Sequence, residues 1–286
     1  MEGEPIVTMM LDDEMTGIEQ LEAIVRLNRE AVGSAALLSR SDARYLVDLY
    51  YSIQEYRIRA AGQARAADGG ADNPVLFMRD EFVKFEHNAQ RLLAAYSNNH
   101  RVGRWSRSIM GIGPVLAAGL LAHVDIEQAP TVGHIWRFAG LDPTVTWDKG
   151  EVRPWNVKLK TLCWKIGESF VKVSGRDNDI YGHVYSERKA LEIQRNDAGE
   201  YAEQAAAALA HKRYGQETIA RAWYEQGKLP PAHIHARAKR YAVKLYLAHW
   251  QHVAYETHYG NPPPMPYIIQ HGGHVDYLAP PNWPMD

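Results

Sequence analysis

Apolar residues recur at helical spacing along most of this chain, and strand-like alternation is almost absent. In residues 41–67 the helically spaced positions are Tyr45, Leu46, Leu49, Tyr50, Ile53, Tyr56 and Ile58. Residues 75–97 have Phe77, Phe82, Phe85, Leu92, Leu93 and Tyr96 at similar intervals. A turn sequence rich in Gly, Asp and Pro separates the two segments at 68–74. The pattern predicts two long antiparallel helices, with Ser41 and Asp42 as N-cap candidates.

The rest of the chain also favours helices, so the expected fold class is nearly all-α. Further helices are predicted at 15–32, 105–110, 115–124, 132–140, 155–173, 179–194, 200–214 and 232–258. One short strand is conceivable at Ile6–Leu11. We expect a helical hairpin in residues 1–100, a helical domain in 101–258 and a Pro-rich extended tail in 259–286.

A Gly-Ile-Gly-Pro sequence at Gly111–Pro114 lies between two predicted helices, which is the pattern of a helix-hairpin-helix. Glycines permit a turn tight enough for a phosphate to approach the backbone. Pro114 suits the first turn of a helix, where its missing N–H is not needed. The free N–H groups of that turn attract anions. The motif therefore predicts contact with DNA phosphates without sequence preference.

Basic residues accompany this motif. Arg101, Arg104 and Arg107 precede it, and Lys158, Lys165 and Lys172 recur along the predicted 155–173 helix. Residues 101–172 have a net charge of +4, whereas the remainder of the chain has −6. The candidate DNA contacts are Arg104, Arg107, Gly111, Ile112, Gly113, Pro114, Val115, Lys158 and Lys165. The alternative is an ordinary tight turn between helices with surface arginines.

Composition bounds the class of protein. The 286 residues are 46% hydrophobic and 23% charged, with a net charge of −2, which indicates a globular chain and excludes a generally basic DNA binder. Cys163, the single cysteine, fits a buried helix position and a reducing compartment. No apolar run approaches the ~20 residues of a membrane span, and the N-terminus lacks a signal-peptide pattern. We therefore expect a cytoplasmic protein, either associated with the nucleoid or in the host cytoplasm, without membrane contact.

Other clusters offer weaker candidates for chemistry. His249, His252 and Glu256 share one predicted helix face and could bind a metal with His271 and His274 from the tail, but they match no zinc signature. Asp177, Asp179, His183 and Glu187 could serve a nuclease, although a helix cap and a solvated face explain them as well. Neither cluster is assigned a metal, and no cofactor is predicted.

Four tryptophans fall in the basic segment: Trp136, Trp147, Trp155 and Trp164. Base stacking on single strands is one interpretation of them. Trp136 and Trp164 fit core positions on short helices, so we expect both to be packed. Trp147, in a polar loop, is the candidate to test for stacking.

Four sequence segments in order resemble one family. Residues 110–118 are similar to its Gly-(Ile/Cys)-Gly-Pro-x-x-Ala-Ala motif, and residues 131–143 to the motif that ends in Ala-Gly-Leu-x-Pro. Residues 155–162 are similar to its Gly-Asn-x-x-Leu-Arg-x-Leu, and residues 236–245 to its last helix. About half of the chain thus resembles the C-terminal helix-hairpin-helix domain of bridge-RNA-guided, DEDD-type insertion-sequence transposases.

Two parts of that family's pattern are not found. Its ribonuclease-H-like domain needs on the order of 130 residues, but about 100 mostly helical residues precede the hairpin here. Asp12, Asp13 and Glu14 follow the only candidate strand, and helix N-terminal charge explains them better. The family's catalytic serine would fall in residues 144–154, which contain only Thr144 and Thr146 as hydroxyl residues. No catalytic residue is therefore assigned, and the helices at 41–97 instead resemble the family's dimerising coiled coil.

The favoured function is DNA binding by a transposase-related homodimer or higher oligomer, with RNA as a further candidate partner. One alternative is an active transposase or recombinase to which RNA or a partner protein supplies the missing parts. A second alternative is a non-enzymatic structural protein of a mobile element that retains the old domain for packing.

Overall fold

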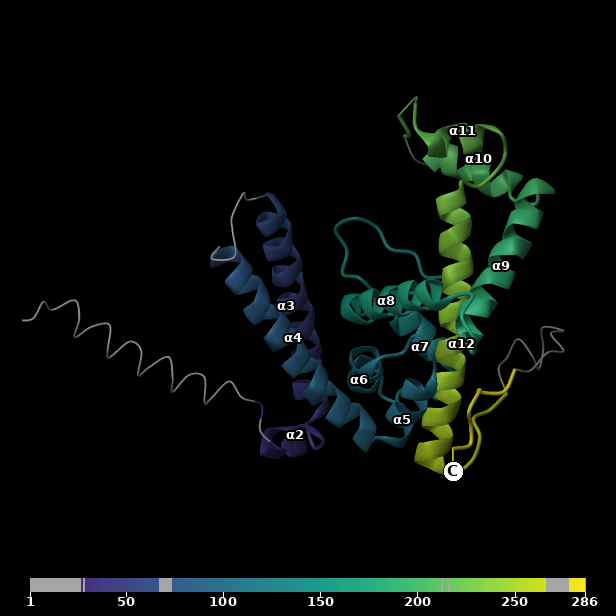
Figure 1. The fold of residues 1–286 in the computed structure, drawn as a ribbon. Coiled ribbons are helices and arrows are strands. Elements are labelled where there is room, and N and C mark those ends of the chain that lie inside the picture. The colour runs from purple at the N-terminus through teal and green to yellow at the C-terminus, as the bar shows by residue number, and fades with distance from the viewer. Residues whose placement is uncertain are drawn as a thin grey trace, which may run out of the picture. The chain divides into compact units, whose positions relative to one another are not determined.

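The computed structural model describes residues 27, 29–66, 74–211, 213–215, 217–265 and 278–285, which form eleven helices and no strand (Figure 1). The all-α prediction is confirmed for this part of the chain. Several expectations fall outside it: the strand at 6–11, the acidic residues 12–14, most of the helix at 15–32, the turn at 68–73, His271 and His274.

The chain divides into two compact units, residues 1–96 and 97–286. The first contains α2 (Arg29–Ala35), α3 (Arg40–Ala66) and most of α4 (Pro74–Asn99). The two predicted long helices are thus confirmed. Glu86 of α4 accepts hydrogen bonds from Tyr50, Gln54 and Arg57 of α3. Tyr56 stacks on Phe82, with ring centroids 5.8 Å apart.

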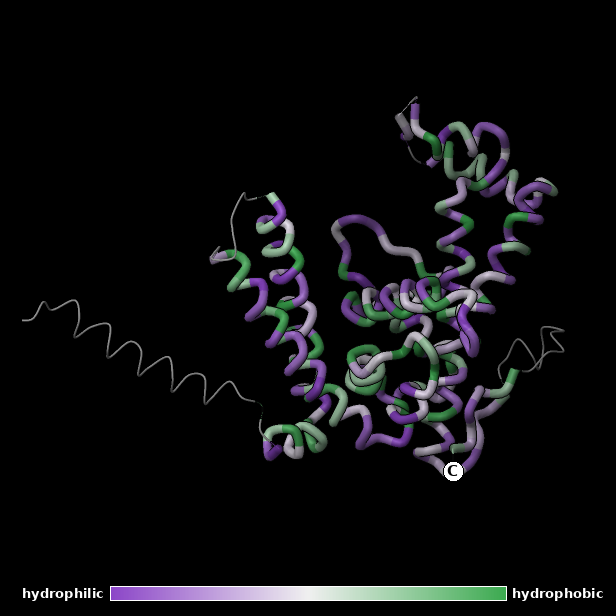
Figure 2. The backbone as a smooth tube through the Cα atoms, viewed as in Figure 1, coloured by the Kyte–Doolittle hydropathy of each residue, from purple (hydrophilic) through white to green (hydrophobic). Residues whose placement is uncertain are grey.

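The α3–α4 pair leaves many large apolar side chains exposed. Figure 2 shows hydrophobic and hydrophilic residues interspersed along both helices. The exposed ones are Tyr45, Tyr56, Ile58, Phe77, Met78 and Phe85. Two helices can bury only one side of each other, so a broad apolar pattern exceeds what this pair can cover.

The second unit contains the remaining helices. These are α5 (Arg101–Ser108), α6 (Pro114–His123), α7 (Val132–Phe138), α8 (Val157–Val173), α9 (Ile180–Asp197), α10 (Ala202–His211), α11 (Ile219–Glu225) and α12 (Pro231–Tyr259). The long α12 packs against α5, α7, α8 and α9. Helix α11 was not predicted, because its seven residues carry no extended apolar pattern.

An aromatic core lies where α5, α8, α9 and α12 meet. Trp105, Phe170, Tyr181 and Tyr246 are almost fully buried. Tyr246 lies at the centre: its ring centroid is 5.9 Å from that of Trp105, 5.5 Å from Phe170 and 5.2 Å from Tyr181. Cys163 is buried as expected, and burial raises the pKa of its thiol to about 12.

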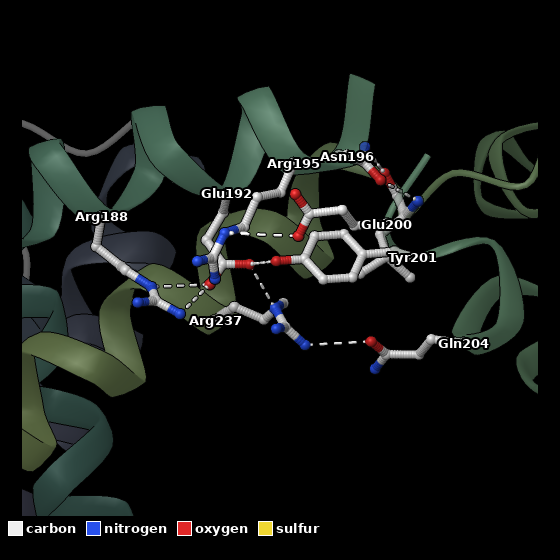
Figure 3. A network of polar contacts seen from close by, with 9 residues as sticks. Arg188, Glu192, Arg195, Asn196, Glu200, Tyr201, Gln204 and Arg237 are labelled. Atoms are coloured by element: carbon white, nitrogen blue, oxygen red, sulfur yellow. Dashed lines mark hydrogen bonds and ion pairs between the residues drawn. The ribbon is translucent and has the colours of Figure 1, made fainter. Parts of the chain in front are cut away.

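A second, polar cluster joins α9, α10 and α12 (Figure 3). The carboxylate of Glu192 is 1% exposed and accepts hydrogen bonds from Arg188 (2.8 Å), Arg237 (2.7 Å) and Tyr201 (2.5 Å). Burial alone would raise the pKa of Glu192, but these hydrogen bonds outweigh burial and lower it. Here two arginines share one buried carboxylate as their counter-charge.

The C-terminal segment 278–285 runs along α5 and α12. Its Pro281 carbonyl accepts a hydrogen bond from Trp105 Nε1 at 2.7 Å, and Trp283 Nε1 donates to Glu256 at 2.8 Å. Arg101 lies 4.7 Å above the Trp283 ring. The described part of the tail thus packs against its own subunit and engages Arg101.

Candidate functional site: the corner between α5 and α6

The corner between α5 and α6, residues 109–113, contains the Gly-Ile-Gly sequence. Gly111 has φ +93°, a conformation that side chains rarely adopt, so glycine is required there. A Cβ atom at Gly111 would lie only 3.3 Å from Ser169 Oγ and 3.4 Å from Phe170 Cδ1 of α8. Ser169 Oγ donates a hydrogen bond of 2.5 Å to the Gly111 carbonyl. The corner is therefore fixed to α8 by packing and by one hydrogen bond.

Gly113 differs from Gly111 in every respect. It is the N-cap of α6 with φ −82° and ψ 175°, which any residue can adopt. A Cβ atom there would meet nothing within 4 Å, and the residue is exposed. The expectation that both glycines serve the tight turn is thus correct for Gly111 and wrong for Gly113. Gly113 instead leaves open space in front of the first turn of α6.

The first turn of α6 presents its backbone donors to that space. Pro114 has no N–H. The backbone N–H of Ala117 donates to the carbonyl of Gly113 at 3.0 Å, which is the first hydrogen bond of α6. The N–H groups of Val115 and Leu116 belong to the donors that a helix start leaves unpaired. The side chains of Ile112 and Val115 are buried. Only the backbone of these two predicted contacts is therefore in a position to bind a ligand.

The predicted cations approach the corner from two helices. On α5, Arg104 Nη1 donates to Asn98 O at 2.9 Å and Arg107 Nη1 to Asn98 Oδ1 at 2.5 Å. Asn98 thus orients both guanidinium groups without neutralising them. Arg107 also lines a cavity of about 470 Å³ beside the corner. The other lining residues are Ser108, Ile109, Met110, Asn178, Ile180 and Asn282.

On α8, Lys165 and Lys172 lie one turn before and about one turn after Ser169, on the side that contacts the corner. Burial, followed by the charge of Lys172, lowers the pKa of Lys165. Lys158 lies eleven residues before Ser169, about 16 Å along the helix. Helical spacing therefore puts Lys165 on the face of α8 that contacts the corner, whereas Lys158 lies well away along the helix.

Ser169 and Lys172 were not among the candidate contacts. The seven-residue recurrence of lysines pointed to Lys172. The role of Ser169 depends on a contact between residues 58 positions apart, which no local pattern reveals.

The other predicted clusters do not assemble. His249 uses both ring nitrogens within the protein, Nδ1 with Tyr181 OH at 2.6 Å and Nε2 with the Leu278 carbonyl at 2.9 Å. His252 instead pairs with Glu256 at 3.2 Å. The metal hypothesis for these three residues is therefore wrong. No group of three or more His, Cys, Asp and Glu that could hold a metal ion occurs among the described residues.

The Asp179 cluster is also structural. Asp179 Oδ2 accepts a hydrogen bond of 2.6 Å from Gly175 N, at the turn after α8, and makes no side-chain cap to α9. His183 and Glu187 form an exposed pair at 3.1 Å. The expected cap is thus replaced by a bond across the turn.

Comparison with known proteins relates the chain to insertion-sequence transposases. Residues 106–147, which include the corner, α6 and α7, match the sequence model of the Transposase IS116/IS110/IS902 family. No curated protein and no solved structure matches the chain. No described helix is long and apolar enough to cross a membrane. The matched segment supports the transposase resemblance there, and the likeness of residues 155–162 and 236–245 stays a prediction.

Proposed function

We propose that this chain binds the phosphate backbone of DNA without sequence preference, using the α5–α6 corner as a helix-hairpin-helix. The backbone N–H groups of Val115 and Leu116 would donate to one phosphodiester. The partial positive charge of the α6 N-terminus would add to this attraction. The relation to insertion-sequence transposases, which act on DNA, supports this proposal.

The observation that carries the proposal is the open space at Gly113. Neither its backbone angles nor its neighbours require glycine. Asn, Asp and Ser cap a helix better than glycine does. A residue with a side chain would, however, fill the space through which a phosphate reaches the α6 amides. Phosphate binding therefore explains a glycine that the fold does not need.

Cations around the corner would strengthen the same contact. Arg104 and Arg107 make no ion pair with a carboxylate among the described residues, and both donate to Asn98 instead. Lys165 adds a positive charge on α8. Each contact between a cation and a phosphate adds to the affinity for DNA, and this contribution depends on salt concentration but not on base sequence. A protein with this function would lie in the cytoplasm of its host, associated with the nucleoid when bound to DNA.

We further propose that two copies pair through the exposed apolar residues of the α3–α4 helices, so that two corners contact one duplex. Phe77 is 64% exposed and Phe85 is 43% exposed on the same helix. Sedimentation of the full chain should show a dimer that the Phe77→Glu, Phe85→Glu variant loses. Leu37→Glu, at another exposed apolar site, is the matched control. A wild-type monomer at micromolar concentration would contradict pairing.

The test of the phosphate contact compares Gly113→Asp with Gly113→Asn. Both side chains have nearly the same shape, and both are good N-caps, so both variants should be at least as stable as the wild type. Asp places a negative charge where the phosphate would bind, whereas Asn only narrows the space. Fluorescence anisotropy with a labelled duplex measures the affinity of each variant.

We expect Gly113→Asp to weaken duplex binding by at least about tenfold. The Asp carboxylate repels the phosphate and accepts the hydrogen bonds of the α6 N–H groups in its place. Gly113→Asn should weaken it by a smaller factor. Equal affinity of Gly113→Asp and wild type would overturn the assignment of the corner. Absence of duplex binding by the wild type at low salt would overturn the function itself.

A further inference from the structure

A second basic and aromatic surface lies on the other side of α8 from the α5–α6 corner. We call it the tryptophan–arginine surface and define it by Trp147, Arg153, Trp155, Lys160, Trp164 and Arg240. Lys160 precedes Ser169 by nine residues, which is two and a half helical turns, so the two residues face opposite ways. Trp164 lies one turn after Lys160 on the same side.

The loop between α7 and α8 builds the first part of this surface. Trp147 Nε1 donates to the Glu151 carbonyl at 2.8 Å, which closes the loop on itself. The Trp147 and Trp155 rings meet edge to face with centroids 6.2 Å apart. Gly140, with φ +64°, lies directly beneath Trp155, because a Cβ atom there would come within 2.8 Å of Trp155 Cγ. The ring pair is therefore held in place rather than left in a loose loop.

Three cations gather around these rings. Arg153 Cζ lies 5.1 Å from the Trp147 ring centroid, and Lys160 Nζ lies 4.0 Å from that of Trp155. Burial, then the charges of Arg153 and of Arg240, lower the pKa of Lys160. Arg240 on α12 thus belongs to the same group. No ion pair in the described part of the chain neutralises any of the three. The charge of Glu192 offsets only part of the lowering of the Arg240 pKa by burial and by Arg237. Like charges held together without an ion-pair partner cost free energy, which an anionic ligand would recover.

Trp164 adds an exposed stacking platform. The ring is 57% exposed, so the expectation of a core position is wrong. Lys239 lies 5.2 Å from its centroid and is itself paired with Glu168, which fixes one side of the indole. The exposed face of this indole is available to stack on a planar ligand.

We propose that the tryptophan–arginine surface binds an unpaired stretch of nucleic acid. A base stacks on Trp164, while Arg153, Lys160 and Arg240 contact phosphodiester oxygens. Trp147 and Trp155 hold two of the cations in position. Exposed rings interleaved with unneutralised cations are the combination by which proteins bind single strands. A duplex hides its base faces, so it would use only the cations. This proposal is independent of the function proposed for the corner.

The experiment measures binding of the full chain to labelled oligo(dT) and oligo(U) of about 12 nucleotides, within the usual site sizes for single strands. A duplex of equal length is titrated in parallel at about 50 mM salt. Trp164→Leu removes the aromatic ring, and Arg240→Gln removes one cation. The matched controls are Ile219→Ala, an exposed apolar residue on α11, and Arg221→Gln, a partly exposed cation that pairs with Glu225 on the same helix.

We expect Trp164→Leu to weaken single-strand binding by about tenfold, the usual scale for one stacked base. Arg240→Gln should lower the salt slope of that binding by about one. The duplex affinity of Trp164→Leu should stay within about twofold of wild type, as should the single-strand affinity of both controls. Gly113→Asp should retain single-strand binding. Binding of both oligomers or of either one supports the site.

Three results would overturn the proposal: no binding of either single strand by the wild type, unchanged single-strand affinity in Trp164→Leu, or an equal loss of duplex affinity in that variant. Circular dichroism and thermal melting of each variant separate loss of binding from loss of fold.

Discussion

Arg237 and Arg240 lie three residues apart on α12, but their surroundings differ. Arg237 donates to the buried carboxylate of Glu192, which also binds Arg188 and Tyr201. Arg240 instead lies near Lys160, which Arg153 also approaches, and makes no ion pair among the described residues. The charge of Glu192 reaches Arg240 but offsets only part of the lowering of its pKa by burial and by Arg237. The contrast separates cations that stabilise the fold from cations available to a ligand. Residue type alone does not make this distinction.

The largest effect is expected from removing the charge of Glu192. Glu192→Gln leaves two arginines without their counter-charge, and breaking such a pair from one side is strongly destabilising. Because the arginines are about one quarter exposed, we expect a loss of about 2–3 kcal/mol in the free energy of unfolding. Urea denaturation measures it. Duplex and single-strand affinities of the folded variant should not change, and a selective loss of either would contradict the structural role.

His249 should make stability depend on pH. Burial lowers its pKa from 6.5 to about 4 in the folded protein. Below pH 6.5 the unfolded chain therefore takes up a proton that the folded protein refuses. Stability should fall by about 2 kcal/mol between pH 6.5 and pH 5 through this residue alone. His249→Gln should flatten the dependence in that window. Equal pH profiles for the wild type and this variant would refute the assignment.

The pair Arg237→Gln and Arg240→Gln sharpens the comparison directly. Arg237→Gln should lower the free energy of unfolding by about 1–2 kcal/mol, because a hydrogen bond to a buried charge is lost. Arg240→Gln should leave stability unchanged or slightly higher, because it relieves repulsion with its neighbours. Urea denaturation of both variants at neutral pH provides the measurement. An equal loss in the free energy of unfolding for the two variants would show that their different surroundings do not affect stability.

The smallest effect concerns the contact between Ser169 and the α5–α6 corner. Ser169→Ala removes one hydrogen bond to the Gly111 carbonyl and should cost about 1 kcal/mol of stability. Its effect on duplex affinity should be about threefold or less, since packing of Gly111 against Phe170 remains. Ser186→Ala, at a hydroxyl pair near the α8–α9 turn, serves as the control. A loss of affinity as large as that of Gly113→Asp would assign the serine a direct role.

The sequence predicted the long helices and the corner for physical reasons that are local. Periodic apolar residues defined α3, α4, α8, α9 and α12 within a few residues, because each helix buries a stripe along its length. Pro114 and the glycines located the start of α6. By contrast, α11 is held by packing: its Tyr224 joins a small cluster with Tyr201, Ala205, Leu229 and Ile234. No pattern within seven residues encodes that contact.

The candidate sites were harder to predict because they depend on residues far apart in the chain. Arg153, Lys160 and Arg240 come together only when α12 packs on α8. Trp164 fits a core position by spacing, yet α8 turns that side outwards. His249 and His252 share a helix, but their partners come from α9 and from α12 itself. Helical spacing places a residue on a face without saying what covers that face.

The central claim is that main-chain amides at the start of α6 bind a DNA phosphate. The most direct measurement is the change in amide chemical shifts when a duplex is added to the isotope-labelled full chain. We predict the largest shifts at Gly113, Val115 and Leu116, with smaller ones along α5 up to Arg104. A duplex that binds and shifts other amides, while these three remain unchanged, would contradict the account.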